Sequence, residues 1–248
     1  MRKALLYFRA ILFFLGLVVF TLAIGVISLI VWPLPLNRRY RYVIRWSHWV
    51  IAWARWICGL NYQVEGTHHV PKGPVIVISN HQSAWEGIFF QTFFPQQTWV
   101  LKKELLRIPF FGWALASVKP IAIDRSKKLS ALDQLLKQGK EHLQNGRWVI
   151  IFPEGTRSKP GSLRRFSLGG AALAAETGVP VLPVVHNAGE YWPPNQLIKR
   201  PGTIRVKIGE LIETQGLEPR EINRRVREWI ETELHALHTQ QHMALNLL

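Results

Sequence analysis

The pattern of apolar and polar positions changes character at about residue 60. From Ala10 to Trp32 there are 23 consecutive residues without an ionisable side chain, and a helix of about 20 such residues crosses the hydrocarbon core of a bilayer. A second segment, about Arg41 to Cys58, is mostly aromatic and aliphatic, which is typical of a helix that lies at a membrane interface. Residues 1–60 are therefore predicted to form a two-helix membrane anchor. Basic residues flank the first apolar run on both sides, so its orientation, spanning or dipping, stays open.

From Asn61 onward, short apolar runs alternate with longer helical stretches. Two of the runs, Val75–Ile78 and Val149–Phe152, are unbroken, which is typical of central strands that are covered on both faces. The alternation predicts an α/β domain over residues 61–248, built as an αβα sandwich on a mostly parallel or mixed sheet. The predicted strands are Tyr62–Glu65, Val75–Ser79, Thr98–Leu101, Pro120–Ile123, Trp148–Phe152, Val181–Val185 and Thr203–Ile208. The predicted helices are Ser83–Phe93, Phe110–Ser117, Leu129–Asn145, Leu168–Thr177 and Pro219–Leu237.

The net charge of +15 indicates an anionic partner, which is either nucleic acid or a membrane surface. Its distribution favours the membrane, because no acidic residue precedes Glu65 and the basic residues before it are interleaved with tryptophans. Tryptophan at the headgroup level and cations facing anionic lipid are typical of a bilayer surface. An anionic phospholipid bilayer is therefore the predicted partner, and nucleic acid is not. The single cysteine, Cys58, excludes an intrachain disulfide and fits a reducing compartment.

The first candidate catalytic residues follow the predicted strand Val75–Ser79, in the segment Asn80–Glu86. Functional groups collect at the carboxyl ends of strands in open α/β sheets. A histidine serves as general base at neutral pH when a carboxylate fixes its tautomer. His81 and Glu86 can form such a pair if His81 lies in the turn and Glu86 in the first helical turn. A structural interpretation competes with this one, because Ser83 and Glu86 also match a helix capping box.

The second group of candidates is Phe152–Arg157, directly after another predicted strand. Its glycine lets a ligand approach the backbone, its threonine supplies a hydroxyl, and Arg157 offers a planar fork for phosphate. The alternative is a tight turn with a solvated arginine. A third group, Asp124 and Arg125, ends the predicted strand Pro120–Ile123, and its alternative is an ordinary surface ion pair.

In this order, the segments resemble the motifs of the glycerolipid acyltransferase family, and within it the bacterial 1-acylglycerol-3-phosphate acyltransferases. Asn80–Glu86 resembles the family's His-x4-Asp motif, with Glu86 where the family usually has aspartate. The resemblance covers roughly residues 60–215. Its other parts are Lys102–Gly112, which is similar to the stretch between the first two motifs, and Ala122–Arg125, Phe152–Arg157 and Val179–Pro183, which are similar to the second, third and fourth motifs.

The resemblance implies a role for each candidate residue. It makes His81 the base that deprotonates the attacking hydroxyl, Glu86 the carboxylate that orients His81, and Lys102 an oxyanion partner near the thioester carbonyl. It implies no metal and no cofactor, because the acyl group arrives on a co-substrate, an acyl-CoA or acyl-carrier protein. The glycerol phosphate would be held by Arg125, Glu154, Gly155, Thr156 and Arg157.

The implied activity is transfer of a fatty acyl group to the sn-2 hydroxyl of 1-acyl-sn-glycerol 3-phosphate, giving phosphatidic acid. The resemblance also implies a bacterial inner membrane, with the catalytic domain on the cytoplasmic side. Transfer to another lysolipid acceptor is the nearest alternative. A lipid hydrolase that uses Ser83 or an activated water is another, although no Gly-x-Ser-x-Gly elbow is present. A non-catalytic, basic membrane adaptor is the third.

Overall fold

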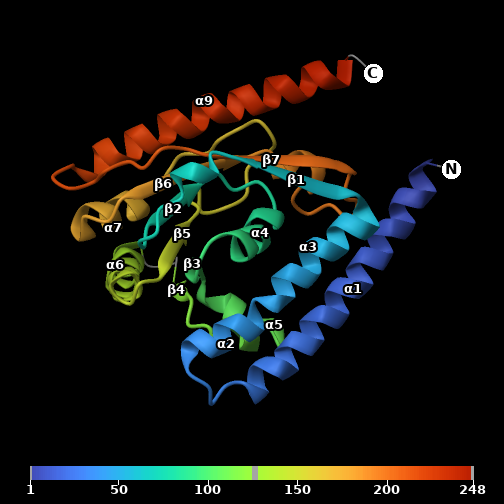
Figure 1. Cartoon of the computed structure of the whole chain (residues 1–248), viewed down its shortest axis with the longest axis horizontal. Helices are drawn as coiled ribbons and strands as arrows, with labels where there is room; N and C mark the ends of the chain where they lie inside the picture. Colours follow the sequence, from blue (N-terminus) through green and yellow to red (C-terminus); the bar gives the residue numbers. More distant parts are fainter. Residues whose placement is uncertain (1, 125–127, 247–248) are drawn as a thin grey trace.

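A seven-stranded mixed sheet forms the centre of the computed structural model, which describes residues 2–124 and 128–246 (Figure 1). The order across the sheet is β1-β7-β6-β2-β5-β3-β4. Neighbouring strands run parallel, except that β6 and β7 are antiparallel. The strands are β1 (Leu60–Glu65), β2 (Ile76–Ser79), β3 (Gln97–Lys102), β4 (Ile121–Ile123), β5 (Trp148–Ile151), β6 (Val181–His186) and β7 (Gly202–Ile208).

Helices cover both faces of this sheet (Figure 1). On one face lie α1, α3 and α4, and on the other lie α6, α7 and α9. The helices are α1 (Arg2–Ile30), α2 (Leu36–Val43), α3 (Arg45–Cys58), α4 (Trp85–Phe93), α5 (Phe111–Ser117), α6 (Lys128–Gln144), α7 (Gly169–Thr177), α8 (Ala188–Tyr191) and α9 (Pro219–Asn246), with short 3-10 helices η1 (Thr67–His69) and η2 (Lys103–Arg107).

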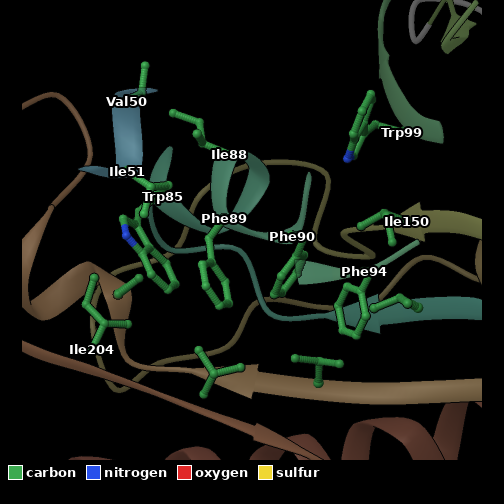
Figure 2. Packing of buried hydrophobic residues seen from close by; sticks show 14 of the residues in the cluster. Val50, Ile51, Trp85, Ile88, Phe89, Phe90, Phe94, Trp99, Ile150 and Ile204 are labelled. Atoms are coloured by element: carbon green, nitrogen blue, oxygen red, sulfur yellow. The ribbon is translucent and has the colours of Figure 1, made fainter. Parts of the chain in front are cut away.

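The central strands are buried on both faces, and successive residues enter different hydrophobic cores. In β5, Trp148 and Ile150 pack with the core that contains α4, whereas Val149 and Ile151 pack with the core that contains α7. Aromatic side chains of α4, among them Phe90, fill the first of these cores (Figure 2). Side chains of a strand alternate between its two faces, so a strand covered on both sides is apolar at every position.

The predicted αβα sandwich is confirmed, and each of the seven predicted strands is present with bounds that differ by one or two residues. The five predicted helices correspond to α4, α5, α6, α7 and α9, of which α9 continues to Asn246. The sequence analysis did not predict α8, η1 or η2. These elements hold only three to five residues each, which is too short for a hydrophobic period to be recognised.

Residues before β1 form three helices, which corrects the prediction of two. The expected helix at about Arg41–Cys58 is divided at Ile44, where α2 ends and α3 runs back beside α1 (Figure 1). Tyr40 of α2 is buried, and its hydroxyl accepts a hydrogen bond from the amide of Gln97 in β3 at 3.3 Å. No glycine or proline lies between Arg41 and Cys58, so the sequence carries no sign of the bend.

Helix α1 is long and apolar enough to cross a membrane by length and composition, and an 18-residue window within it has a mean hydropathy of 2.9. One of its faces nevertheless packs on the protein: the indole of Trp53 lies across Gly16 and donates to the carbonyl of Leu12 at 3.3 Å, and Gly25 contacts Phe110. Phe13 belongs to the core that contains α4. The opposite face presents exposed apolar side chains along the whole helix: Leu5, Phe8, Ile11, Phe14, Leu15, Val18, Val19, Leu22, Val26, Leu29 and Ile30.

Candidate active site

His81 follows β2 at the carboxyl edge of the sheet, and Glu86 lies in the first turn of α4. The Nδ1 atom of His81 is 2.8 Å from the Oε1 atom of Glu86. An ionised carboxylate can only accept, so this contact places the proton on Nδ1 and leaves the lone pair of Nε2 available. The imidazole stacks on the ring of Phe152, with centroids 4.5 Å apart. The side chain remains 24% exposed, so His81 is both fixed and accessible.

Glu86 makes the contacts of a helix cap as well as the contact with His81. Its Oε1 atom accepts the amides of Gln82 at 2.9 Å and Ser83 at 2.8 Å, and the second of these is the backward contact of a capping box. The hydroxyl of Ser83 accepts the amide of Trp85 at 3.1 Å. The two interpretations of the sequence are therefore compatible in one geometry.

The carboxyl of Glu86 is fully buried. Burial opposes its ionisation, but His186, the hydrogen bond from His81 and the amide of Ser83 outweigh that effect and lower the pKa of Glu86 below its ordinary value. A buried carboxylate that accepts several N–H groups stays ionised. The site therefore keeps one fixed negative charge behind the imidazole.

Asn80 and His186 form a network behind this pair that the sequence analysis did not recognise. Asn80 donates to the carbonyl of His186 at 2.9 Å and accepts its amide at 3.1 Å, which ties the end of β2 to the end of β6. The ring of His186 accepts the amide of Ala188 on Nδ1, so Nε2–H donates to the carbonyl of Asn80 at 3.0 Å. Burial lowers the pKa of His186, and its Nε2 atom lies 3.9 Å from Oε1 of Glu86.

The turn after β5 explains why the sequence Phe-Pro-Glu-Gly occurs there. The amide of Gly155 donates to the carbonyl of Phe152 at 3.1 Å, and Gly155 has a φ of 68°. A β-turn favours proline at its second position and glycine at its fourth, and glycine adopts positive φ without steric cost. The turn reverses the chain and brings the residues after it against the loop that carries His81.

Residues in this turn and just after it form hydrogen bonds with both the amide and the carbonyl of His81. Glu154 accepts the amide of His81 on Oε1 at 2.7 Å and the amide of Arg164 on Oε2 at 2.9 Å. Ser158 donates to the carbonyl of His81 through its amide at 2.8 Å and through its hydroxyl at 3.1 Å. Burial raises the pKa of Glu154 above its ordinary value, although the amides of His81 and Arg164 favour the charged form. Both oxygens of Glu154 are thus engaged by main-chain groups.

A cavity of about 680 Å³ opens beside His81. Its mouth is lined by Lys102, Gly155, Thr156 and Arg157, of which all four are exposed. Arg157 makes no hydrogen bond or ion pair with the residues that the structure describes. Arg125, the remaining predicted phosphate ligand, lies outside the described residues.

The inner part of the cavity is an apolar chamber between the N-terminal helices and β3. Cavities of a few hundred to about 1,000 Å³ with mostly apolar walls are typical of sites for small ligands. The described residues contain no group of three or more His, Cys, Asp or Glu side chains that could hold a metal ion. The chamber walls include Leu17 and Ile24 of α1, Tyr40 and Val43 of α2, Trp46 of α3, Ile88 of α4, Trp99 to Leu101 of β3, and Phe111 and Leu115 of α5.

A histidine–carboxylate pair at the mouth of an apolar chamber matches what the motifs imply, and the comparison with known proteins decides the family. A family model described as Acyltransferase matches residues 61–187. The chain belongs to the Acyltransferase family. The resemblance found in the sequence is thereby confirmed.

Two curated relatives of this acyltransferase show how far the similarity extends. It is 47% identical over 227 residues to the 1-acyl-sn-glycerol-3-phosphate acyltransferase of Pseudomonas aeruginosa, covering 90% of this chain and 88% of the relative. It is 31% identical to the protein of the same name from Cocos nucifera over 227 residues, covering 91% and 71% of the two chains. The crystal structure of the 1-acyl-sn-glycerophosphate (LPA) acyltransferase PlsC from Thermotoga maritima matches with a TM-score of 0.80 and 26% identity, covering 96% of this acyltransferase and 98% of that chain.

The sequence did not reveal the buried polar residues that support the site, or the residues of the N-terminal helices that line the cavity. Asn80, Ser158 and His186 are polar and almost fully buried, and burial cannot be read from a single polar residue next to a motif. The chamber residues of α1 and α2 were assigned to a membrane anchor. Their apolar pattern is equally compatible with lipid and with an internal cavity.

Proposed function

We propose that this acyltransferase transfers a fatty acyl group from an acyl thioester to the sn-2 hydroxyl of 1-acyl-sn-glycerol 3-phosphate, and so makes phosphatidic acid. Two observations support the proposal: the fixed His81–Glu86 pair at the chamber mouth, and similarity to relatives named for this acceptor over most of the chain. The donor is an acyl-CoA or an acyl-carrier protein. The reaction needs no cofactor, because neither the attack nor the departure of the thiol requires one.

In the proposed reaction, Nε2 of His81 takes the proton from the acceptor hydroxyl as its oxygen attacks the thioester carbonyl. Glu86 fixes the tautomer and stabilises the imidazolium that forms. The new ester C–O bond forms, the C–S bond breaks, and the thiolate leaves with the proton that His81 carries. No covalent acyl-enzyme is required. For Lys102, which lines the cavity, we propose stabilisation of the negative charge that develops on the carbonyl oxygen.

The exposed groups after β5 are the proposed phosphate site. The guanidinium of Arg157 is not committed to another described residue, and Gly155 and Thr156 stand beside it at the mouth of the cavity. A planar fork suits bidentate contact with a phosphate. Arg125 is included by its position in the second motif alone. For Glu154 we propose a different role from the one that the resemblance implies: because its oxygens accept the amides of His81 and Arg164, it positions His81.

The apolar chamber is proposed to hold an acyl chain during the reaction. Its walls are mostly aliphatic and aromatic, and they lead inward from His81. Burial of methylene groups contributes about 0.8 kcal/mol each, so a long chain in such a space binds well. Because α1 and α2 form part of these walls, the N-terminal helices belong to the binding site as well as to the attachment of the protein.

The membrane partner is proposed to be an anionic bilayer, the bacterial inner membrane, with the sheet on its cytoplasmic side. The uncovered face of α1 is apolar along its length, and water is a poor solvent for such a surface. The other face of α1 packs on α3, α5 and the core, so a helix that crossed the bilayer would draw these elements into hydrocarbon. We therefore infer that α1 lies within one leaflet.

A lipid hydrolase is not favoured by the geometry. Ser83, its candidate nucleophile, is fully buried and its hydroxyl caps α4. The deciding experiment measures thiol release and lipid products with acyl-CoA and acyl-carrier protein donors, each with 1-acyl-sn-glycerol 3-phosphate, with a phosphate-free lysolipid, and without acceptor. The proposal expects thiol release that depends on the phosphate acceptor. Release of free fatty acid regardless of acceptor would indicate the hydrolase, and absence of turnover with lipid binding retained would indicate the adaptor.

A further inference from the structure

The segment from η2 to the first turn of α5, Lys103–Trp113, has no part in the proposed chemistry, although it resembles a family segment. Its inner side forms part of the chamber wall, through Leu105 and Phe111. Its outer side is exposed. It is thus a thin partition between the acyl chamber and the surroundings of the protein.

The backbone of this segment is strained at one position. Phe110 has φ 62° and ψ −59°, and the amide of Phe111 donates to the carbonyl of Pro109 at 2.7 Å. This is a γ-turn of the rare kind, which is unfavourable for a bulky side chain. Such strain persists only where the surroundings impose it. The surroundings impose it here, because Phe110 packs closely against Gly25 of α1. A Cβ atom added at Gly25 would lie only 2.5 Å from the Cβ atom of Phe110.

The outer side of the segment presents large apolar side chains next to the end of α1. Ile108 is 44% exposed and Trp113 is 38% exposed, whereas Phe110 between them packs against Trp113 with tilted rings whose centroids are 4.7 Å apart. At the end of α1, Ile30 and Trp32 are also exposed. In Figure 1, α5 lies beside the lower end of α1, which agrees with the contact between Phe110 and Gly25.

Cations accompany this apolar surface. Lys103 and Arg107 are exposed on the same segment, and the guanidinium of Arg39 lies 5.7 Å from the centre of the Trp32 ring. Apolar and aromatic side chains mixed with lysine and arginine are characteristic of a surface that enters the headgroup region of an anionic bilayer. The combination fits lipid better than a folded protein partner, because the segment packs beside α1, whose other face is apolar and uncovered.

We propose that Lys103–Trp113 is a second bilayer-contacting surface, which inserts Ile108 and Trp113 beside the end of α1. The strained turn at Phe110 directs these side chains outward while Leu105 and Phe111 face the chamber. An acyl chain could then pass between lipid and chamber at this edge without crossing water. This inference rests on the proposed function only for the passage of substrate; the contact itself can be tested without turnover.

The first test compares two substitutions of equally exposed aliphatic residues. Ile108 and Leu168 are each 44% exposed, but Leu168 lies at the start of α7, on the other face of the sheet. For Ile108→Ser we expect a loss of about tenfold in activity on acceptor presented in phosphatidylethanolamine–phosphatidylglycerol vesicles, because one inserted aliphatic side chain contributes about one decade in affinity. In detergent micelles the same variant should be normal. Leu168→Ser should be normal in both. Equal loss for Ile108→Ser in vesicles and micelles would overturn the proposal, and so would no loss in either.

The second test reads the contact directly in the full-length chain. Ile108→Cys and Leu168→Cys are each labelled with an environment-sensitive fluorophore; the native Cys58 is buried. Addition of the same vesicles should shift the emission of the label at 108 to the blue and shield it from a water-soluble quencher, with little change at 168. An unchanged signal at 108 would overturn the proposal even if the enzyme is active. A blue shift at 108 without vesicles that depends on protein concentration would indicate a second copy of the chain as the occupant, and would also overturn it.

Discussion

The loop after β2 and the three residues Gly155–Arg157 after β5 meet at the same edge of the sheet, but they are built in opposite ways. In the first, Asn80, Ser83 and Glu86 are fully buried and each is hydrogen-bonded. In the second, Gly155 to Arg157 are exposed at the chamber mouth. The difference fits the role that we propose for each part. A general base must be held in one geometry, because small displacements of reacting atoms are costly, whereas a cation for a mobile phosphate group works from a flexible side chain.

The largest effect should come from the reacting group itself. His81→Ala removes the base, and the chemical step should fall by 10²–10⁴-fold, the usual contribution of general base catalysis. Folding should be unaffected, since the loop is held through the backbone of His81 by Glu154 and Ser158. Single-turnover kinetics measure the step, and circular dichroism controls for folding. Near-normal turnover in a folded variant would remove His81 from the mechanism.

Glu86→Gln tests whether the charge or only the cap matters. Glutamine keeps a carbonyl oxygen for the amides of Gln82 and Ser83 but carries no charge to support the imidazolium. We expect kcat to fall by about 10²-fold, with a stability change within about 1 kcal/mol at neutral pH. Normal kcat with unchanged stability would assign Glu86 to the cap alone.

The same variant has a distinct pH profile of stability. The pKa of Glu86 is lowered by folding, so the unfolded chain binds the proton more tightly. The carboxylate therefore stabilises the wild-type protein above the ordinary pKa of 4.5, and this contribution is lost as the pH falls through the lower folded pKa. Denaturant titrations should show that wild type and Glu86→Gln converge in stability at acid pH. Parallel profiles would contradict the assignment of a folded-state charge.

Glu154→Gln distinguishes positioning of His81 from contact with phosphate. Glu154 accepts hydrogen bonds from the main-chain amides of His81 and Arg164. The N–H₂ group of glutamine cannot accept, so one of these two hydrogen bonds is lost. We expect a fall of about tenfold in kcat, the scale of one lost charge-assisted hydrogen bond, with the KM for the acceptor nearly unchanged. Ser158→Ala, which removes only the hydroxyl contact to His81, should give a smaller change of the same kind. A rise in acceptor KM at constant kcat would return Glu154 to the phosphate site.

The smallest effect should come from a substitution among the exposed residues after β5. Arg157→Lys keeps the charge but loses the planar fork, so the KM for 1-acyl-sn-glycerol 3-phosphate should rise by roughly fivefold, with little change in the KM for the donor. Lys159, a nearby exposed cation, provides the matched control as Lys159→Arg. Steady-state kinetics with and without a phosphate-free acceptor make the measurement. Equal impairment toward both acceptors would contradict phosphate recognition by Arg157.

Much of this site could be predicted because its motifs are short and local. His81 and Glu86 lie five residues apart, so a single loop and one helical turn decide whether they meet. The turn Phe152–Gly155 likewise needs only proline and glycine at the right offsets. The place of both segments at one edge follows from parallel strands, whose carboxyl ends lie together.

The bend at Ile44, the Asn80–His186 network and the chamber could not be predicted in this way, since each depends on residues that are distant in the sequence. Asn80 and His186 are 106 positions apart, and neither residue type indicates which distant residue it will bind. In the same way, Tyr40 contacts Gln97 only because α2 lies against the start of β3.

The sequence by itself predicted the αβα sandwich, its seven strands and the pairing of His81 with Glu86. Hydrophobic periodicity and turn chemistry act over a few residues, and they are therefore visible in one dimension. The tertiary structure alone decided that Glu154 turns its carboxylate to the backbone of His81, and that α1 offers one face to the protein core and leaves the other uncovered. An apolar side chain gains by leaving water whichever surface covers it. Only the packed chain shows which surface that is.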